Sequence, residues 1–365
     1  MLSLSDDQVR RLADPVSVID ALRATFSRDY ASTLNMPVRT SVDIGDGVLL
    51  VMPAYDSAMG VAGVKTVTVT QANGVSANYD LIDAAGGLRL ARMQANYLTD
   101  LRTAATSAVA TDLLARADAQ TLGTFGSGRQ AEGHLAVVSR VRKFQRFLVC
   151  GSGRSDLSPF IASMRERHGL AVEAVDARTC ASESDVICTC TTSGVPVFAG
   201  EWLKPGAHIN AVGAFQPMTR EVDDHTVARS RVFVETYDGA FAEAGDILIP
   251  ISNKAITKSH IAADLHEIAS GKKAGRLTPD DITLFKSLGC ALEDLVTAQL
   301  VYSAQGCEIV GTGRPPTDDK ENLRFRCIRR WRVRRVDSAF SPPQRGLRRA
   351  SGRLRTGEQP CQFRR

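Results

Sequence analysis

The sequence lacks the features by which several classes of protein are identified. None of its apolar runs approaches the roughly 20 residues that span a bilayer, and the N-terminal MLSLSDDQVRRL has no basic segment followed by an apolar core. We therefore expect no membrane span and no secretory signal, and we predict a cytoplasmic location. The eight cysteines include no C-x-x-C pair of the kind that holds zinc, so we expect reduced thiols and no metal.

Lysine is absent and acidic residues are scarce at the end of the chain. Residues 324–365 contain fourteen Arg, one Asp and one Glu, so this segment accounts for the net charge of +5 and the rest is mildly acidic. From about residue 317 onward there is no usable amphipathic period, and such a segment cannot bury enough apolar surface to offset its ordering entropy. We expect residues 317–365 to be disordered. Arginines could neutralise nucleic-acid phosphates, but the composition resembles run-on coding sequence, and we rank a nucleic-acid partner last.

A dinucleotide-binding pattern is present between residues 120 and 155. A short apolar run, Thr121 to Phe125, precedes GSGRQA, which has the spacing G-x-G-x-x-A, and apolar residues at helical spacing follow. Gly126 permits a tight turn, Gly128 leaves room for a pyrophosphate, and Ala131 lets the helix lie close to the sheet. The pattern predicts a strand, turn and helix that bind a nucleotide.

The end of the second strand of this unit indicates the cofactor. An NAD site has Asp or Glu there to accept from the ribose 2′-hydroxyl. This chain has CGSGRS, in which Arg154 with the hydroxyls of Ser152 and Ser155 would suit a 2′-phosphate, because a guanidinium pairs with phosphate through charge-assisted hydrogen bonds. We predict NADPH as the cofactor, with NADH as the alternative.

The length of 365 residues suggests two domains. Residues 1 to 95 combine a helix that starts at Asp14-Pro15 with alternating strand patterns, which predicts an α+β unit on an antiparallel sheet. Its predicted strands lie within 38–52, with a turn at 45–47, and within 61–69, 79–82 and 88–91. Thr99 to Ala115 predicts a helix, with Thr99 as its N-cap.

The part of the chain after the glycine turn predicts a doubly wound α/β fold. Six short apolar runs without alternation fit parallel strands that are covered on both faces. These runs are 121–125, 147–150, 171–175, 186–191, 209–212 and 232–235. The segment Ile282 to Ser303 predicts a long helix that returns to the first domain.

Three cations occur in otherwise apolar or strand-like settings: Arg39, Lys65 and Arg102. Basic residues on strands usually face solvent, but Lys65 shares a strand face with three valines and should point inward, where an unpaired ammonium is costly. Arg102, which we place in the first turn of its helix, is at the unfavourable end of the helix dipole. A bound carboxylate would compensate both, so we predict a site for an anionic substrate.

Taken together, the motifs resemble the ornithine cyclodeaminase and mu-crystallin family. The similar segments, in the order of that family, are LTDLRTAATSAVATDLLA, GTFGSGRQA, CTTSGVPVF, GAHINAVGAFQPMTREVD, AEAGDILIPI and FKSLGCALEDLVTAQLVY. The resemblance covers residues 1 to 313. It implies a Rossmann NAD(P)-binding domain of residues 117–291, inserted into an α+β substrate and dimerisation domain. That domain comprises residues 1–116 and a helix around 292–313, and the protein would be a homodimer.

The resemblance also implies roles for individual residues. Arg39, Lys65 and Arg102 match the residues that hold the substrate carboxylate, and Lys65 would also lie near the ring nitrogen. The residues expected to line the cofactor are Gly126, Ser127, Gly128, Arg129, Gln130, Arg154, Ser155, Thr191, Ser193, Gly213 and Ser287.

Position 215 separates the branches of the family. Ornithine cyclodeaminases carry an Asp two residues after the glycine that matches Gly213, and it is the acid/base in ring closure. This chain has Phe215, whose ring cannot transfer a proton. The resemblance therefore implies NAD(P)H-dependent reduction of the cyclic ketimines Δ1-pyrroline-2-carboxylate and Δ1-piperideine-2-carboxylate to L-proline and L-pipecolate, with Phe215 packed on the substrate ring. One departure is that Pro217 and Met218 are adjacent, where that branch more often has P-x-M.

Reduction of a cyclic imine does not need an acid at position 215, because a protonated imine already carries its proton. The reaction needs mainly a hydride and a site that holds the substrate carboxylate in place. Three alternatives stay open. They are an ornithine cyclodeaminase, an enzyme similar to the family's alanine dehydrogenases, and a non-catalytic NADPH-binding protein similar to mu-crystallin. Ammonium-dependent turnover would distinguish the second, and tight cofactor binding without turnover the third.

Overall fold

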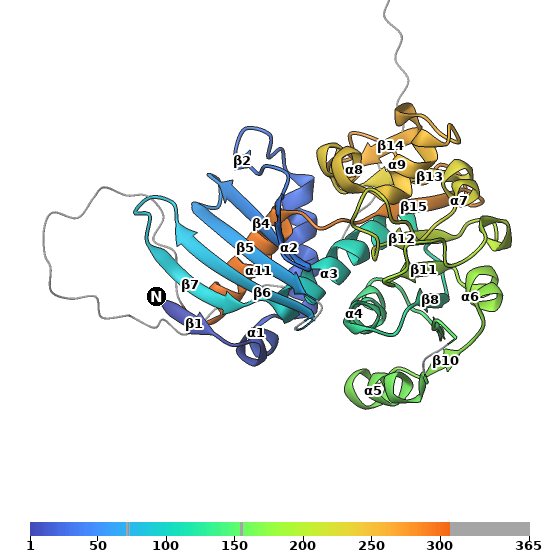
Figure 1. The fold of residues 1–365 in the computed structure, drawn as a ribbon, viewed down its shortest axis with the longest axis horizontal. Helices are drawn as coiled ribbons and strands as arrows, with labels where there is room; N and C mark the ends of the chain where they lie inside the picture. Colours follow the sequence, from blue (N-terminus) through green and yellow to red (C-terminus); the bar gives the residue numbers. More distant parts are fainter. Residues whose placement is uncertain (71, 73, 154–155, 307–365) are drawn as a thin grey trace, which may run out of the picture. The chain divides into compact units, whose positions relative to one another are not determined.

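Two β-sheets form in different parts of the chain in this computed structural model (Figure 1). The structure describes residues 1–306, without 71, 73, 154 and 155. The first sheet is formed before residue 95 and the second after residue 120. The predicted disordered tail, residues 317–365, lies outside the described residues.

The first sheet has seven strands in the order β1-β7-β6-β5-β4-β2, with β3 also paired to β4. The strands are β1 (Leu2–Leu4), β2 (Leu34–Asn35), β3 (Thr40–Ile44), β4 (Gly47–Asp56), β5 (Val61–Thr70), β6 (Gly74–Asp83) and β7 (Arg89–Gln94). Every pair is antiparallel except β1 with β7. The predicted antiparallel unit is confirmed, apart from β1, whose three residues are too few to show a period. Gly45, with φ of +70°, makes the predicted turn before β4.

Helices from both ends of the described chain surround the first sheet. α1 (Asp6–Leu12), α3 (Asn96–Leu114) and α11 (Ala291–Ala304) contact its strands, and α2 (Pro15–Ser27) packs on α3 and α11. α11 contacts β4, β5 and β6 and also packs on α2 and α3, so the chain returns to its first sheet as predicted (orange helix in Figure 1). Asp14 caps α2 by accepting from the backbone N–H of Ser17, and Val18, Leu22 and Phe26 are buried.

The second sheet consists of parallel strands in the order β10-β9-β8-β11-β12-β15-β13-β14. The strands are β8 (Thr121–Phe125), β9 (Arg146–Cys150), β10 (Val172–Ala174), β11 (Val186–Thr189), β12 (His208–Ala211), β13 (Ser230–Val234), β14 (Ile261–Asp264) and β15 (Ile282–Lys286). The α-helices of this part are α4 (Arg129–Val138), α5 (Ser158–His168), α6 (Ala177–Glu183), α7 (Asp224–Arg229), α8 (Tyr237–Glu243), α9 (Gly245–Ser252) and α10 (Leu265–Ala269), with short 3₁₀ helices η1 (Gly200–Trp202) and η2 (Lys258–His260). The predicted Rossmann-type α/β sheet is confirmed.

Three details of the prediction are wrong. The sheet has eight strands instead of six, because β14 and β15 were not recognised. Ile282–Lys286, predicted as helix, is a fully buried strand between β12 and β13, and its continuous apolar and β-branched run is typical of such a strand. Thr99 is not an N-cap, since α3 begins at Asn96 and the Thr99 hydroxyl donates to the Ala95 carbonyl at 2.7 Å. Arg102 consequently lies in the second turn of α3.

The described residues bear on two expectations from the sequence, which concern membrane spans and the state of the cysteines. None of the helices that the structure describes has the length and apolar content needed to cross a bilayer. Five cysteines fall within the described residues and are free thiols, as predicted: Cys150, Cys180, Cys188, Cys190 and Cys290.

Candidate active site

The glycine turn between β8 and α4 has the geometry that its sequence predicts. Gly126 has φ of +105°, and a Cβ there would clash with the carbonyl oxygen of Cys190. Gly128 is the N-cap of α4, and the described residues leave the space within 4 Å of its Cβ position open. Ala131 is fully buried. Open space next to the free N–H groups of a helix N-terminus fits a pyrophosphate, so the turn is suited to a dinucleotide.

The other residues of the turn contact the protein in different ways. Ser127 is half-buried. Arg129 Nε lies 3.4 Å from one carboxylate oxygen of Asp100, and Gln130 Nε2 donates to the other at 2.9 Å. Burial raises the pKa of Asp100 to about 6, although the charge of Arg129 opposes this. Arg129 and Gln130 thus hold α4 against α3, and their contact with a cofactor stays a prediction.

Arg154 and Ser155, on which the preference for NADPH depends, lie outside the described residues. β9, which precedes them, is parallel to β8, so its carboxyl end is at the same edge of the sheet as the glycine turn. That edge is where Rossmann folds bind their nucleotide. The preference for NADPH over NADH therefore rests on the sequence.

The loops after β11 and β12 meet at one buried carboxylate. Glu221 Oε1 accepts from the backbone N–H and from the hydroxyl of Thr191, both at 2.7 Å, and Oε2 accepts from the N–H of Gly213 at 2.6 Å. Ser193 donates its N–H to the Thr191 hydroxyl at 3.1 Å and its own hydroxyl to the Val195 carbonyl at 2.7 Å. Thr191, Ser193 and Gly213 thus follow two neighbouring strands at their carboxyl ends, where ligands of parallel sheets bind.

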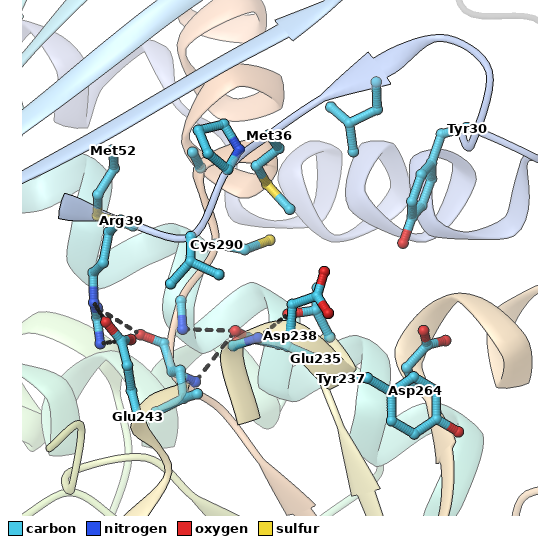
Figure 2. Close-up of a pocket in the computed structure, with 18 of the residues that line it drawn as sticks. Tyr30, Met36, Arg39, Met52, Glu235, Tyr237, Asp238, Glu243, Asp264 and Cys290 are labelled. Carbon is cyan, nitrogen blue, oxygen red and sulfur yellow. Dashed lines mark hydrogen bonds and ion pairs between the residues drawn. The ribbon is translucent and has the colours of Figure 1, made fainter. Parts of the chain in front are cut away.

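A cavity of about 350 Å³ brings together residues from the parts of the chain that form the two sheets (Figure 2). Its walls come from residues 30–39, 235–243 and 288–291, together with Met52 and Asp264. This volume suits a small molecule. Figure 2 shows Arg39 on one side of the cavity and Asp264 on the other.

Arg39 is the predicted cation that lines this cavity. Its guanidinium forms a two-point ion pair with Glu243, at 3.0 Å and 2.7 Å. It also donates to the carbonyl oxygens of Leu288 and Phe215, both at 3.3 Å. Phe215 is 37% exposed, and the centroid of its ring lies 5.7 Å from the guanidinium carbon. Arg39 therefore connects the loop that carries Phe215 with the loop that precedes α11.

Lys65 and Arg102 are buried against two acids of α11. Lys65 Nζ lies 2.8 Å from Asp294, and Arg102 lies 2.7 Å from Glu293 and 3.0 Å from Asp294. The two cations are 1% and 5% exposed. The inward orientation predicted for Lys65 is confirmed. The inference that a bound carboxylate must compensate the two cations needs correction, because α11 supplies the anions. A Cβ on Gly289, which lines the cavity, would clash with the Arg102 guanidinium, so the two are in direct contact.

The charges in this buried cluster influence one another. Burial, and then the charge of Arg102, lowers the pKa of Lys65 to about 8. Burial, and then the charge of Glu235, raises the pKa of Glu293 well above its usual range. Both shifts disfavour the charged forms of these two groups, whereas, against the effect of burial, Asp294 and Glu293 raise the pKa of Arg102.

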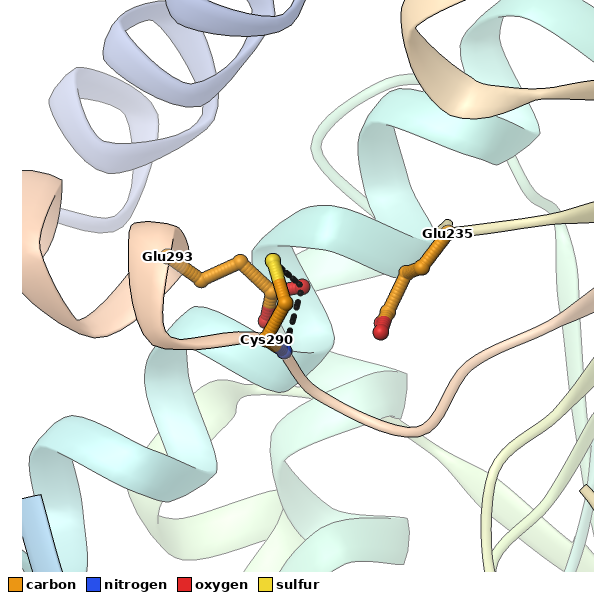
Figure 3. Close-up of side chains that lie close together, drawn as sticks. All are labelled: Glu235, Cys290 and Glu293. Atoms are coloured by element: carbon orange, nitrogen blue, oxygen red, sulfur yellow. Dashed lines mark hydrogen bonds between the residues drawn. The ribbon is translucent and has the colours of Figure 1, made fainter. Parts of the chain in front are cut away.

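Glu235, Cys290 and Glu293 bring two carboxylates and a thiol within 4.8 Å of one another (Figure 3). Glu235 accepts from the hydroxyl of Ser287 at 2.6 Å and from the N–H of Gly289 at 2.7 Å. Burial, and then the charge of Glu293, raises the pKa of Cys290 well above that of a free thiol. Glu235 thus fixes the connection between β15 and α11. Ser287, predicted to line the cofactor, is 1% exposed and its hydroxyl is bound to Glu235.

The acidic partners of the site were missed from the sequence. Glu293 and Asp294 occur in ALEDLV, where apolar neighbours predict a buried helix, and buried acids on such a helix require cationic partners. That signal was available. Glu235 directly follows β13, and Glu243 is the last residue of the short helix α8. No local sequence pattern connects either residue with Arg39.

The second sheet with its glycine turn identifies a dinucleotide-binding protein of the Rossmann type, and the cavity adds room for a small molecule beside a fixed guanidinium. The particular family is then clear. The model of the ornithine cyclodeaminase/mu-crystallin family matches residues 2–306, so the chain belongs to that family. The resemblance inferred from the motifs is confirmed.

Two similar sequences and one solved structure each match most of the chain. A Δ(1)-pyrroline-2-carboxylate reductase of Bacillus cereus is 34% identical over 312 residues, 83% of this chain and 96% of the relative. Ketimine reductase mu-crystallin of Mus musculus is 34% identical over 312 residues, 82% of this chain and 94% of the relative. The solved structure of Thermococcus litoralis Δ(1)-pyrroline-2-carboxylate reductase with NADH and L-proline has a TM-score of 0.80 at 35% identity. That match covers 83% of this chain and 97% of the other.

Proposed function

We propose that the protein reduces the cyclic ketimines Δ1-pyrroline-2-carboxylate and Δ1-piperideine-2-carboxylate to L-proline and L-pipecolate, with NADPH or NADH as reductant. The observation that carries this proposal is the pairing of Phe215 with Arg39 at the cavity. It occurs in a chain similar to reductases of this class over almost their whole length. An aromatic ring replaces the acid/base that ring closure needs, while a guanidinium for the substrate carboxylate remains.

Arg39 would orient the substrate. Glu243 fixes one edge of its guanidinium, and a fixed guanidinium binds a carboxylate with little loss of side-chain entropy. Phe215 would pack against the apolar face of the substrate ring. The resemblance also implies direct contact of Lys65 and Arg102 with the carboxylate. The Arg102 guanidinium lies against Gly289 of the cavity wall, so its direct contact would require that connection to move aside.

When bound, NADPH or NADH would provide the hydride needed at the imine carbon. The residues that would hold it are those of the glycine turn (Gly126, Ser127, Gly128, Arg129 and Gln130), with Thr191, Ser193 and Gly213 at the neighbouring strand ends and Arg154 and Ser155 after β9. The open space at Gly128 supports this assignment. Ser287 would act indirectly, because its hydroxyl is occupied by Glu235.

The domain division and the homodimer are also part of the proposal. Residues 1–116 and the helix around 292–313 would form the substrate and dimerisation domain, and residues 117–291 the Rossmann domain. Exposed apolar side chains on strands of the first sheet, among them Val42, Ile44 and Val75, support an interface there. Light scattering of the purified protein tests the dimer. A cytoplasmic location stays a prediction from the sequence.

The test of the function is incubation with NADPH, and separately NADH, and each cyclic imine. We expect oxidation of the nicotinamide and formation of L-proline or L-pipecolate, and no ammonia from L-ornithine. Ammonia release from ornithine without cofactor oxidation by either imine would overturn the proposal. Ammonium-dependent reduction of an open-chain 2-oxo acid would place the protein with the alanine dehydrogenases. Tight cofactor binding without any turnover would indicate a binding protein.

A further inference from the structure

Glu221, Asp246 and Lys286 form a fully buried charged network at the carboxyl ends of β12 and β15. The carboxylate of Glu221 accepts five hydrogen bonds. The donors are the hydroxyl of Thr189, the N–H and hydroxyl of Thr191, and the N–H groups of Gly213 and Ala214. A buried carboxylate with so many donors has one orientation only, because any rotation would leave N–H groups unpaired.

Lys286 and Asp246 complete the network. Lys286 Nζ donates to the carbonyl of Ala214 at 2.6 Å and lies 2.9 Å from Asp246. Asp246 accepts from the backbone N–H of Glu221 at 2.7 Å. Both the N–H and the carbonyl of Ala214, the residue before Phe215, are therefore held by buried charged side chains.

The backbone around this network has little room to relax. A Cβ on Gly213 would lie 2.5 Å from Glu221 Oε1, and a Cβ on Gly245 would clash with the carbonyl oxygen of Thr219. The loop from residue 213 to residue 221 is thus fixed at both ends. A buried ionic network of this kind is weak evidence for stability, since apolar groups of similar size often serve as well. The network is better explained by its effect on the backbone geometry of this loop.

The loop is connected to the cavity through Arg39, which lines it and contacts both the carbonyl and the ring of Phe215. We propose that Glu221, Asp246 and Lys286 are positioning residues for the proposed imine reduction. They hold the turn at Gly213 and Ala214 so that Phe215 and Arg39 keep one orientation toward the substrate. None of the three lines the described cavity, so they act on it through the backbone that they hold. That backbone is the turn at Gly213 and Ala214 and, for Glu221, also Thr191. The inference rests on the proposed function.

The decisive variant is Glu221→Gln, which keeps the size of the side chain but offers one acceptor oxygen where the carboxylate has two. Its amide N–H groups would face the N–H donors of Thr191 or Gly213. We expect kcat for imine reduction to fall about 10- to 100-fold, the effect of a displacement of about 1 Å in an active site. Glu201→Gln, a change at an exposed glutamate of η1, is the matched control and should leave kcat unchanged.

A double-mutant cycle with Phe215→Ala separates positioning from a general loss of structure. If Glu221 acts through Phe215, the double variant loses about as much kcat/KM as the more impaired single variant, because coupled residues are not additive. Losses that multiply, or a Glu221→Gln enzyme with full kcat, would overturn the inference. Thr189→Val removes one of the five hydrogen bonds without changing the size of the side chain. It keeps the test available if Glu221→Gln does not fold, and it should show the same coupling with a smaller loss.

Hydrogen exchange gives a readout that does not depend on turnover. The amides of Gly213 and Ala214 should be strongly protected in the wild-type protein and lose protection in Glu221→Gln, with the amides of the preceding strand β12 unchanged. Absence of imine reduction by the wild-type protein would refute the proposed function. Normal protection and kcat in Glu221→Gln, with an active wild type, would refute the positioning role alone.

Discussion

The glycine turn and the buried cation cluster differ in how far apart in the sequence their parts lie. The turn from Gly126 to Ala131 contains within six consecutive residues the backbone conformation, the open space and the helix N-terminus that a pyrophosphate needs. The cluster joins Lys65 of β5 to Asp294 of α11, 229 positions later, and Arg102 of α3 to Glu293. The first site is a property of a segment, and the second is a property of the fold.

This difference predicts how each site responds to change. A site made of backbone fails when the backbone conformation is forbidden, whatever the rest of the protein does. A site made of paired charges fails when one partner is removed, because the remaining charge is buried without compensation. The expected consequence is loss of cofactor binding in one case and loss of folding stability in the other.

The largest effect is expected for Asp294→Ala. This change removes the carboxylate that pairs with Lys65 and one of the two that pair with Arg102, and we expect a loss of about 3–5 kcal/mol in the free energy of unfolding. Urea denaturation measures it. Asp118→Ala is the control, because Asp118 is paired with Arg116 but 76% exposed and should change stability little. A loss for Asp294→Ala as small as that of the control would show that the cluster is not an energetic unit.

The next effect is expected for Gly126→Ala. The backbone there has φ of +105° and a Cβ would clash with Cys190, so the turn must change shape. We expect affinity for NADPH to fall about 100-fold, which corresponds to the roughly 1–3 kcal/mol of strain at such a position. Fluorescence titration of the nicotinamide measures it. Gly133→Ala in α4, where the nearest atom would be 3.6 Å away, should bind NADPH normally. Normal affinity in both variants would contradict the assignment of the turn.

The same contrast explains what could be predicted from the sequence. β8, the turn and α4 follow from local spacing and hold in the structure. Lys65 could be placed inside by the period of its strand, but its partner could not be named, because strand period gives direction and says nothing of tertiary neighbours. The sequence predicts a helix where β15 lies, because a short apolar run fits either a buried strand or a buried helix. Only the place of this segment between β12 and β13 distinguishes the two.

A third prediction concerns the pH dependence of the cluster. The pKa of Lys65 is lowered from 10.5 to about 8 in the folded protein, so between these values the unfolded chain binds the extra proton. The contribution of Lys65 to the free energy of unfolding therefore increases as pH rises from about 8 to 10.5. We expect the difference in unfolding free energy between the wild type and Lys65→Met to shift by up to about 3 kcal/mol across this window. A flat difference would indicate that Lys65 stays charged throughout.

The smallest effect is expected for Arg154, the residue through which the nucleotide site would depend on a side chain instead of on the backbone. Arg154 lies outside the described residues, and its proposed role rests on the absence of an acid directly after β9, where the first acid is Asp156, and on the affinity of guanidinium for phosphate. We expect Arg154→Ala to weaken NADPH binding about tenfold, the equivalent of about 1.4 kcal/mol, and to leave NADH binding unchanged, because NADH has no 2′-phosphate. Arg140→Ala, an exposed arginine that follows α4, is the control and should affect neither cofactor. Equal weakening of NADPH and NADH by Arg154→Ala would mean that this arginine serves the parts common to both cofactors. The glycine turn would then carry the nucleotide affinity without any selection at the ribose, and the two sites would differ even more sharply in what their side chains contribute.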